Sequence, residues 1–214
     1  MNQIHISNKE LPEAILLLGP TGSGKTPLGE TLERAGLGGR RCFHFDFGSR
    51  LRRYTGEPTG LLTSGELEVV RGSLLTGALL EDEHFSIAEK LLAGFIRESN
   101  PGPNDLIVMN GLPRHTGQAL ALEGMIDMKA LVVLECTPET VLERIRSDAG
   151  GDRTGRVDDT IEEVKRRLKV FAERTQPLTA YYERRGTPSI CLDIGSSTTA
   201  EEALKTLAGR LSGL

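Results

Sequence analysis

The sequence has little of what several classes of protein require. It contains no Trp, and its aromatic content is only 4%, so it does not predict a platform on which nucleic-acid bases stack. Lys and Arg number 26 against 30 Asp and Glu, which gives a net charge of −4. Proteins held to nucleic acid by phosphate contacts usually carry a basic stripe, and we therefore expect no nucleic-acid partner.

Cysteines and long apolar runs are also scarce. The three cysteines, Cys42, Cys136 and Cys191, lie far apart and form no CxxC pair, a pattern that argues against zinc and for buried, reduced thiols. No run of about 18 apolar residues is present to span a membrane, and residues 1–10 are polar rather than signal-like. We therefore expect a cytoplasmic monomer without a membrane partner.

The sequence does contain a regular alternation of strand-like and helix-like segments. Continuous apolar runs are typical of strands buried on both faces. Five such runs occur: Ala14–Leu18, Arg41–Phe45, Leu106–Met109, Ala130–Glu135 and Ser189–Ile194. The alternation favours a parallel sheet, so we predict an α/β protein with three αβα layers around a parallel five-stranded sheet. Ligands of such sheets bind beyond the carboxyl ends of the strands.

Helical patterns separate these runs. We expect helices over Lys25–Ala35, Ile87–Glu98, Pro138–Ile145, Asp159–Arg184 and Glu201–Leu211. Thr137 is expected to cap the third of them. Asp159 with Glu162 predicts a capping box for the fourth, which Pro177 should kink.

One glycine-rich segment carries a specific chemical signal. Residues 19–26 read GPTGSGKT and match the phosphate-binding pattern GxxxxGK[ST], between a strand-like run and a helical one. Backbone N–H groups of such a loop converge on phosphate oxygens at the N-terminus of a helix. The expected ATP-binding residues are Gly19, Thr21, Gly22, Ser23, Gly24, Lys25 and Thr26. Lys25 should reach the β- and γ-phosphates, and Thr26 should ligate Mg²⁺.

Two further motifs follow the next strand-like runs. Residues 44–52 read HFDFGSRLR, and residues 110–114 read NGLPR, with Gln118 four positions later. These stretches resemble the HxSxGDxLR and DGFPR motifs of adenylate kinases and related nucleoside monophosphate kinases. The resemblance implies that Arg52 and Arg114 hold the phosphate of the monophosphate, that Gly111 lies in the same site, and that Gln118 reads the adenine of AMP.

The second half of the chain continues the resemblance, which covers about residues 14–186. Residues 143–145 (ERI), 155–159 (GRVDD) and 166–168 (RRL) are similar to family segments. By that match Arg144 packs against the ATP base, where a guanidinium over a purine is favourable. Arg156 and Arg167 would join Lys25 and Arg114 around the transferred phosphoryl group, since moving it between two anions needs convergent positive charge.

The resemblance also implies an organisation and an activity. A single domain would have a core of residues 1–46, 104–146 and 159–214, an acceptor-binding insertion at about 47–103, and a short, zinc-free lid at about 147–158. The implied reaction is direct in-line transfer from ATP, with Mg²⁺, to a nucleoside monophosphate. AMP is the expected acceptor, which gives two ADP.

The sequence departs from the family pattern at positions that matter for the metal. Ser49 and Asn110 stand where the family has aspartates that support the water shell of Mg²⁺, and Phe47 replaces a residue near the acceptor nucleoside. We hypothesise that Asp46, at the end of the second strand-like run, has taken over the metal-side role. The lid region is also longer than the pattern, and either Arg146 or Arg153 would supply its first arginine.

Two other functions remain open on this reading. A P-loop kinase of a small hydroxyl-bearing metabolite would use Asp46 as a base or acceptor ligand, as shikimate-kinase-like enzymes use an aspartate there. The missing carboxylates also fit a weakly active, ATP-binding regulatory protein. The retained Lys25, Arg114, Arg156 and Arg167 favour the phosphotransferase.

Overall fold

The computed structural model describes residues 11–56, 60–76, 78–151 and 160–211. Five parallel strands form one sheet in the order β2-β3-β1-β4-β5. Their bounds are β1 Glu13–Leu18, β2 Cys42–Asp46, β3 Leu106–Asn110, β4 Asp127–Glu135 and β5 Ser189–Asp193. The predicted parallel five-stranded sheet is therefore confirmed, with each strand on its expected apolar run.

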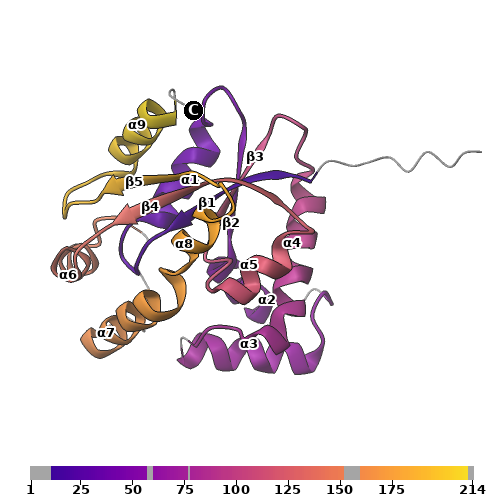
Figure 1. Ribbon diagram of the computed structural model, residues 1–214. Helices are drawn as coiled ribbons and strands as arrows, with labels where there is room; N and C mark the ends of the chain where they lie inside the picture. The colour runs from indigo at the N-terminus through magenta and orange to yellow at the C-terminus, as the bar shows by residue number, and fades with distance from the viewer. Residues whose placement is uncertain (1–10, 57–59, 77, 152–159, 212–214) are drawn as a thin grey trace, which may run out of the picture.

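Helices cover both faces of this sheet, as predicted. In chain order they are α1 Lys25–Ala35, α2 Phe47–Gly56, α3 Ser64–Thr76, the 3₁₀ turn η1 Asp82–His84, α4 Phe85–Ser99, α5 Thr116–Leu122, α6 Pro138–Arg146, α7 Ile161–Val170, the π-helical segment η2 Phe171–Thr175, α8 Leu178–Glu183 and α9 Ala200–Leu211. Figure 1 shows α1 and α9 on one side of the sheet and α4, α5 and α8 on the other, with α2 and α3 beyond them.

The core explains why the strand sequences are apolar without a break. Along β1, Leu16 and Leu18 belong to the cluster under α4, α5 and α8, whereas Ile15 and Leu17 belong to the cluster under α1 and α9. Both sides of the strand are thus buried, and alternation with polar residues is absent. Helix α4 packs against the sheet through this core. The predicted acceptor-binding insertion, at about residues 47–103, includes this helix, and the predicted division of the chain into core, insertion and lid remains a prediction.

The expected helix over Asp159–Arg184 is wrong at its start. Thr160 caps α7, since its Oγ1 accepts a hydrogen bond from the N–H of Glu163 at 3.3 Å; Asp159 lies outside the described residues. Pro177, expected to kink the helix, does mark a break in it: residues 176–177 form a turn between the π-helical segment of residues 171–175, which was not predicted, and α8. Proline lacks the N–H that a continuous helix would need there. The predicted cap of α6 is confirmed, because the N–H of Thr140 donates to Thr137 Oγ1 at 3.2 Å.

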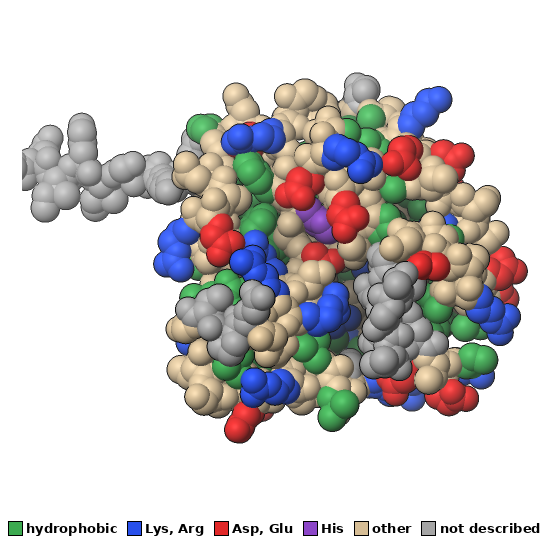
Figure 2. All heavy atoms as spheres, turned by 180° about the vertical axis from the view of Figure 1, so that it is seen from behind, with side chains coloured by type: hydrophobic (Ala, Val, Ile, Leu, Met, Phe, Trp, Pro, Cys, Tyr) green, Lys and Arg blue, Asp and Glu red, His purple; other side chains and the backbone are tan. Residues whose placement is uncertain are grey.

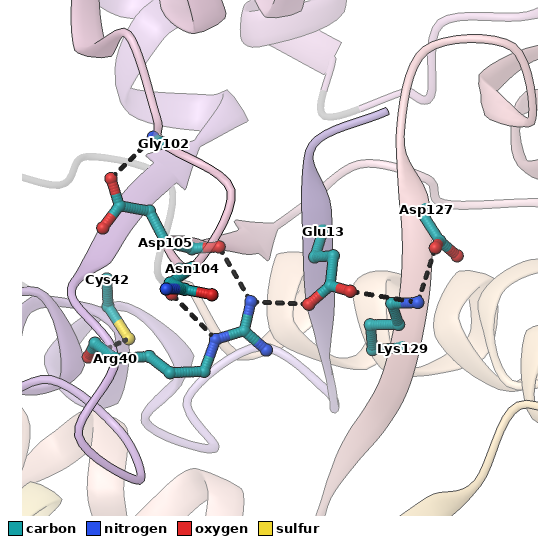
Figure 3. Close-up of polar contacts among 8 residues, drawn as sticks. All are labelled: Glu13, Arg40, Cys42, Gly102, Asn104, Asp105, Asp127 and Lys129. Carbon is teal, nitrogen blue, oxygen red and sulfur yellow. Dashed lines mark hydrogen bonds and ion pairs between the residues drawn. The ribbon is translucent and has the colours of Figure 1, made fainter. Parts of the chain in front are cut away.

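A charged cluster joins the starting ends of the strands, away from the P-loop. Glu13 lies between Arg40, whose Nη2 is 2.6 Å from Glu13 Oε2, and Lys129, whose Nζ is 3.1 Å from Oε1 (Figure 3). Arg40 also donates to the backbone carbonyls of Asn104 and Asp105. Burial would raise the pKa of the Glu13 carboxyl, but the two cations lower it below its ordinary value. The cluster therefore fixes the loop before β2 against β1, β3 and β4.

The surface is of mixed charge. On the face that Figure 2 shows, Lys and Arg side chains are interspersed with Asp and Glu side chains, in keeping with the net charge of −4. Of the helices within the described residues, none combines the length and the hydropathy that a membrane crossing requires.

Candidate active site

A pocket of about 210 Å³ opens at the carboxyl ends of the central strands. Five segments line it: the loop between β1 and α1, the end of β2 with the start of α2, the end of α3 with the residues after it, the loop after β3, and the stretch from α7 into η2. This is the edge where ligands of parallel sheets bind. The pocket brings together Lys25, Thr26, Asp46, Arg52, Gly111, Arg114 and Arg167, all of them predicted from the sequence.

The loop after β1 has the backbone of a phosphate cradle. Gly22 and Gly24 adopt φ values of 79° and 94°, which residues with a Cβ rarely tolerate. A Cβ on Gly19 would lie 2.7 Å from Ser23 Oγ and 2.9 Å from the carbonyl of Leu134. Helix α1 starts at Lys25, so its first N–H groups and the positive end of its dipole point into the loop.

Within the loop, the predicted ATP ligands differ in where they face. Gly19, Thr21, Gly22, Lys25 and Thr26 line the pocket, and Lys25 Nζ donates to the carbonyls of Gly19 and Pro20, each at 2.7 Å. Ser23 is buried, with 1% of its surface exposed, so its side chain belongs to the scaffold of the loop. Gly24 provides space for the guanidinium of Arg144, whose Nη2 would lie 3.1 Å from an added Cβ.

Arg144, predicted to pack against the ATP base, braces the loop from behind. Its side chain is buried, its Nε donates to the carbonyl of Gly22 at 3.1 Å, and its Nη1 donates to the carbonyls of Gly195 and Thr198 at 2.7 and 2.9 Å. The guanidinium thus joins the P-loop to the loop between β5 and α9. Contact with a base remains a prediction, whereas the brace is a structural role that the sequence did not reveal.

Asp46 meets Thr26 and Asn110 in a compact polar triangle. Its Oδ2 accepts hydrogen bonds from Thr26 Oγ1 and Asn110 Nδ2, both at 2.8 Å, and Asn110 Nδ2 also donates to Thr26 Oγ1 at 3.0 Å. Its Oδ1 accepts from the N–H of Ser49 at 2.7 Å and so caps α2. Burial would raise the pKa of Asp46, but the hydrogen bonds from Ser49 and Thr26 lower it, so the group is a carboxylate.

This triangle fits a magnesium ion held jointly with ATP. A hydroxyl and a carboxylate oxygen are the hard donors that Mg²⁺ prefers, and Mg²⁺ is usually held by one or two such groups together with phosphate oxygens. The described residues do not gather three His, Cys, Asp or Glu side chains into a metal cage of their own. Thr26 and Asp46 would hold the ion, which would neutralise phosphate charge.

Positive charge converges on the pocket from three elements. Arg52 lies on α2, Arg114 follows β3, and Arg167 is in the second turn of α7. Arg114 is accessible from the pocket, yet the surrounding protein lowers the pKa of its guanidinium, and the nearby charge of Arg167 lowers it further. An arginine starts from a pKa above 12 and stays charged. Arg52, Arg114 and Arg167 thus bring positive charge into one pocket.

The structure does not place every predicted residue at the pocket. Gln118 is 1% exposed; its Oε1 accepts from the N–H of Arg114 and its Nε2 donates to the carbonyl of Leu80, both at 2.8 Å. Its predicted contact with adenine remains a prediction. Arg156 and Arg153 lie outside the described residues. Arg146 ends α6.

Sequence analysis missed several pocket residues. Val170, Phe171 and Thr175 line the same pocket. The apolar ones look like core residues in the sequence. Thr175 lies in the π-helical segment, whose only signal in the sequence is Pro177 two positions later.

Strand–P-loop–helix connectivity on a parallel sheet, with arginines facing the loop, defines the class as a P-loop kinase. A family model described as an AAA domain matches residues 18–165. The chain is 31% identical over 184 residues to the adenylate kinase of Stenotrophomonas maltophilia (strain K279a), covering 81% of this chain and 87% of that protein. It is 30% identical to the adenylate kinase of Xanthomonas oryzae pv. oryzae (strain MAFF 311018), covering 92% and 99%. The chain belongs to the adenylate kinase family.

A more distant solved structure shares the fold. The gluconokinase from Sinorhizobium meliloti 1021 superimposes with a TM-score of 0.51 at 20% identity, covering 96% of this chain and 98% of that one. At this identity the likeness concerns the fold alone.

Proposed function

We propose that the protein transfers the γ-phosphoryl group of ATP to a nucleoside monophosphate, with AMP as the acceptor and two ADP as the products. One observation carries the proposal: Arg52, Arg114 and Arg167 line the same pocket as Lys25 and Thr26. A kinase whose acceptor is a neutral hydroxyl has one polyphosphate to bind. A kinase whose acceptor is itself a phosphate needs cations on both sides of the transfer.

Each residue then has a defined task. The N–H groups of the P-loop and Lys25 hold the β- and γ-phosphates of ATP, and Arg52 and Arg114 hold the acceptor phosphate. An oxygen of that phosphate forms the new bond to the γ-phosphorus, and the bond to the β–γ bridging oxygen breaks, with its electron pair leaving on ADP. Because the acceptor phosphate is ionised at neutral pH, no general base is required. Arg167, with Arg156, stabilises charge on the transferring group.

The choice of AMP rests on the relatives that carry the name adenylate kinase. The adenine-reading role of Gln118 adds less, since both ends of its amide already bind the backbone. Action in the cytoplasm, as a monomer, completes the proposal.

The metal-side role of Asp46 is part of the same proposal. Oδ2 of Asp46 shares a site with the Thr26 hydroxyl, the P-loop group that ligates Mg²⁺ in such enzymes. Asp46 thereby supplies a carboxylate near the metal, whereas Ser49 and Asn110, which replace the family's aspartates, have none. Asn110 donates to Asp46 and keeps that oxygen in place.

A kinase with a hydroxyl acceptor is the second candidate, because Asp46 ends β2 beside the P-loop and could activate such a group. Two facts weigh against it. Both oxygens of Asp46 already accept hydrogen bonds, and its pKa lies below the ordinary value despite burial. A carboxylate of low pKa is a poor base at neutral pH.

Formation of ADP from ATP and Mg²⁺ tests the proposal, with AMP, GMP, CMP, UMP, shikimate and gluconate offered separately. We expect rapid ADP formation with AMP. Turnover with gluconate or shikimate instead would support the hydroxyl-acceptor kinase. ATP binding without turnover of any acceptor would support a regulatory nucleotide-binding protein.

A further inference from the structure

We propose that Thr175 and Gln118 are positioning residues, which hold the backbone of Arg114 from both sides so that its guanidinium stays in the pocket. The inference rests on the proposed function, in which Arg114 contacts the acceptor phosphate. It gives Gln118 a part in the alignment of Arg114.

The two contacts act on the two peptide groups of one residue. The N–H of Arg114 donates to Gln118 Oε1 at 2.8 Å, and the carbonyl of Arg114 accepts from Thr175 Oγ1 at 2.8 Å. Arg114 lies in the irregular segment between β3 and α5, where neither a sheet ladder nor a helix fixes the backbone. With the peptide groups before and after its Cα restrained, the direction in which the side chain leaves the backbone is restrained as well.

Gln118 is locked at its other end. Its Nε2 donates to the carbonyl of Leu80 at 2.8 Å, and the ring Nε2 of His115 lies 3.3 Å from the same oxygen. Rotating the amide by half a turn would set its oxygen against the Leu80 carbonyl and its NH₂ against the Arg114 N–H, so the orientation is determined. Gln118 is almost completely buried, and both of its polar atoms serve this link.

Thr175 comes from the segment that carries the other arginine. Helix α7 bears Arg167 and continues into the π-helical turn, closed by the N–H of Gln176 donating to the carbonyl of Phe171 at 2.8 Å. Single π-helical turns inside helices occur frequently at functional sites. Here the wider turn places Thr175 against Arg114. It also lets Arg174 pair with both carboxylate oxygens of Glu81, at 3.2 and 2.8 Å.

These contacts close a ring of three segments. Leu80 and Glu81 follow α3, Arg114 and Gln118 follow β3, and Arg174 and Thr175 follow α7. A misplacement of about 1 Å in a reacting geometry can cost about 100-fold in rate, so a loosened ring should appear in kcat.

Thr175→Val tests the proposal, because it keeps the shape of the side chain and removes the hydroxyl. Thr206→Val is the matched control, since Thr206 Oγ1 donates to the carbonyl of Glu202 within α9, remote from the pocket. We expect Thr175→Val to lower kcat about tenfold or more, with the KM for ATP and the Tm unchanged. Thr175→Ser should restore kcat. A Thr175→Val enzyme with the kcat of the control would overturn the proposal.

Gln118→Met distinguishes alignment from base reading. If Gln118 positions Arg114, kcat with AMP should fall about tenfold or more, as in Thr175→Val, with the KM for ATP unchanged. A rise in the KM for AMP with an unchanged kcat would overturn its positioning role.

A readout independent of turnover keeps the inference separate from the proposed function. The NMR order parameter of the Arg114 Nε–H should fall in Thr175→Val and stay unchanged in Thr206→Val. Should the wild-type protein use no monophosphate, the proposed function fails, while this measurement still decides whether Thr175 holds Arg114. An unchanged order parameter in Thr175→Val would contradict the inference.

Discussion

At the scale of single residues, Asp46 performs two tasks with its two carboxylate oxygens. Oδ1 caps α2 through Ser49, and Oδ2 faces Thr26 and Asn110. The change Asp46→Asn separates them, because Asn caps helices as well as Asp does but presents an NH₂ or a neutral oxygen to the metal side.

We expect Asp46→Asn to lower Mg²⁺-dependent kcat by about tenfold or more while the free energy of unfolding changes by about 1 kcal/mol. Steady-state assays over a range of Mg²⁺ concentrations, together with urea unfolding, measure both. Full activity of Asp46→Asn at low Mg²⁺ would show that Asp46 does not support the metal ion. Asn110→Asp is the informative companion, since it restores a carboxylate at a family position.

The second residue to consider is His44, on β2. Its ring packs against α1 so closely that a Cβ added to Gly29 would lie only 2.2 Å from its Nε2. That buried nitrogen has no hydrogen-bond partner among the described residues. His44 is therefore a packing residue, and Gly29 is required by the closeness of the ring rather than by its backbone angles.

Gly29→Ala should therefore destabilise the protein by about 1–3 kcal/mol through overpacking. In a His44→Ala background the same change should be neutral or stabilising by up to about 1 kcal/mol, because Ala favours helix over Gly. Urea unfolding of the four proteins of this double-mutant cycle measures the coupling. Equal effects of Gly29→Ala in both backgrounds would show that the ring is not the obstacle.

The sequence was sufficient for residues whose chemistry is local. Lys25 and Thr26 follow from one motif, and Arg52, Arg114 and Arg167 follow from matched motifs; all line the pocket. The sequence was insufficient where a long-range contact determines how a side chain is placed. Gln118 lies four residues from Arg114 in the sequence, yet its contact with Leu80 exists only in the fold.

At the scale of elements, the P-loop depends on a brace from α6. Arg144 connects Gly22 with the β5–α9 loop through a buried guanidinium. Lys offers one ammonium in place of this planar fork, and it cannot reach carbonyls of both loops with the same geometry.

Arg144→Lys should cost about 2–3 kcal/mol, because buried carbonyls lose their donors, and it should raise the KM for ATP as the loop loosens. Urea unfolding and ATP titration test this, with the exposed Arg184→Lys as control. A variant with wild-type stability and an altered KM would instead point to direct contact between Arg144 and the nucleotide.

Helices with a strong hydrophobic periodicity or with clear start and stop residues were predictable from the sequence. Helix α1 begins at Lys25 and ends before Gly36, as expected. Helices α2, α3 and α5 were not predicted, since few apolar residues mark their buried faces. The π-helical segment in the long helix could not be predicted, because the contacts of its Arg174 and Thr175 join residues that are far apart in the sequence.

At the scale of the whole molecule, the parallel class of the sheet followed from the apolar runs, whereas the strand order did not. Each strand between two helical layers is buried on both sides. Hydrophobicity alone therefore cannot predict which two strands flank a given strand in the sheet. The order places β1 between β3 and β4. This brings the P-loop beside Asn110 and the residues that follow it.

Acid should destabilise the whole molecule in two stages. Burial lowers the pKa of His44 below its ordinary value, although the charges of Asp46, Glu33 and Glu30 oppose this shift. The unfolded chain therefore takes up this proton first, so stability is complete above about pH 6.5 and falls as the pH drops below it. The lowered pKa of Asp46 adds stability that is present above about pH 4 and lost at lower pH.

Urea midpoints measured from pH 8 to pH 3 test these two stages. We expect a plateau above about pH 6.5, a first decline below it, and a steeper one below about pH 4. His44→Leu should remove the first decline and leave the second. A first decline of the same size in His44→Leu would assign it to other groups.

The central claim is that one pocket holds two phosphate-bearing nucleotides end to end. Calorimetric titration with a compound in which two adenosines are joined through five phosphates tests it most directly, because the compound joins both substrates across the transferred group. With Mg²⁺ present, we predict one site per chain and a Kd at least about 100-fold below that for ATP alone, an advantage that Arg114→Lys should largely remove. A Kd equal to that for ATP, unaffected by Arg114→Lys, would contradict the account.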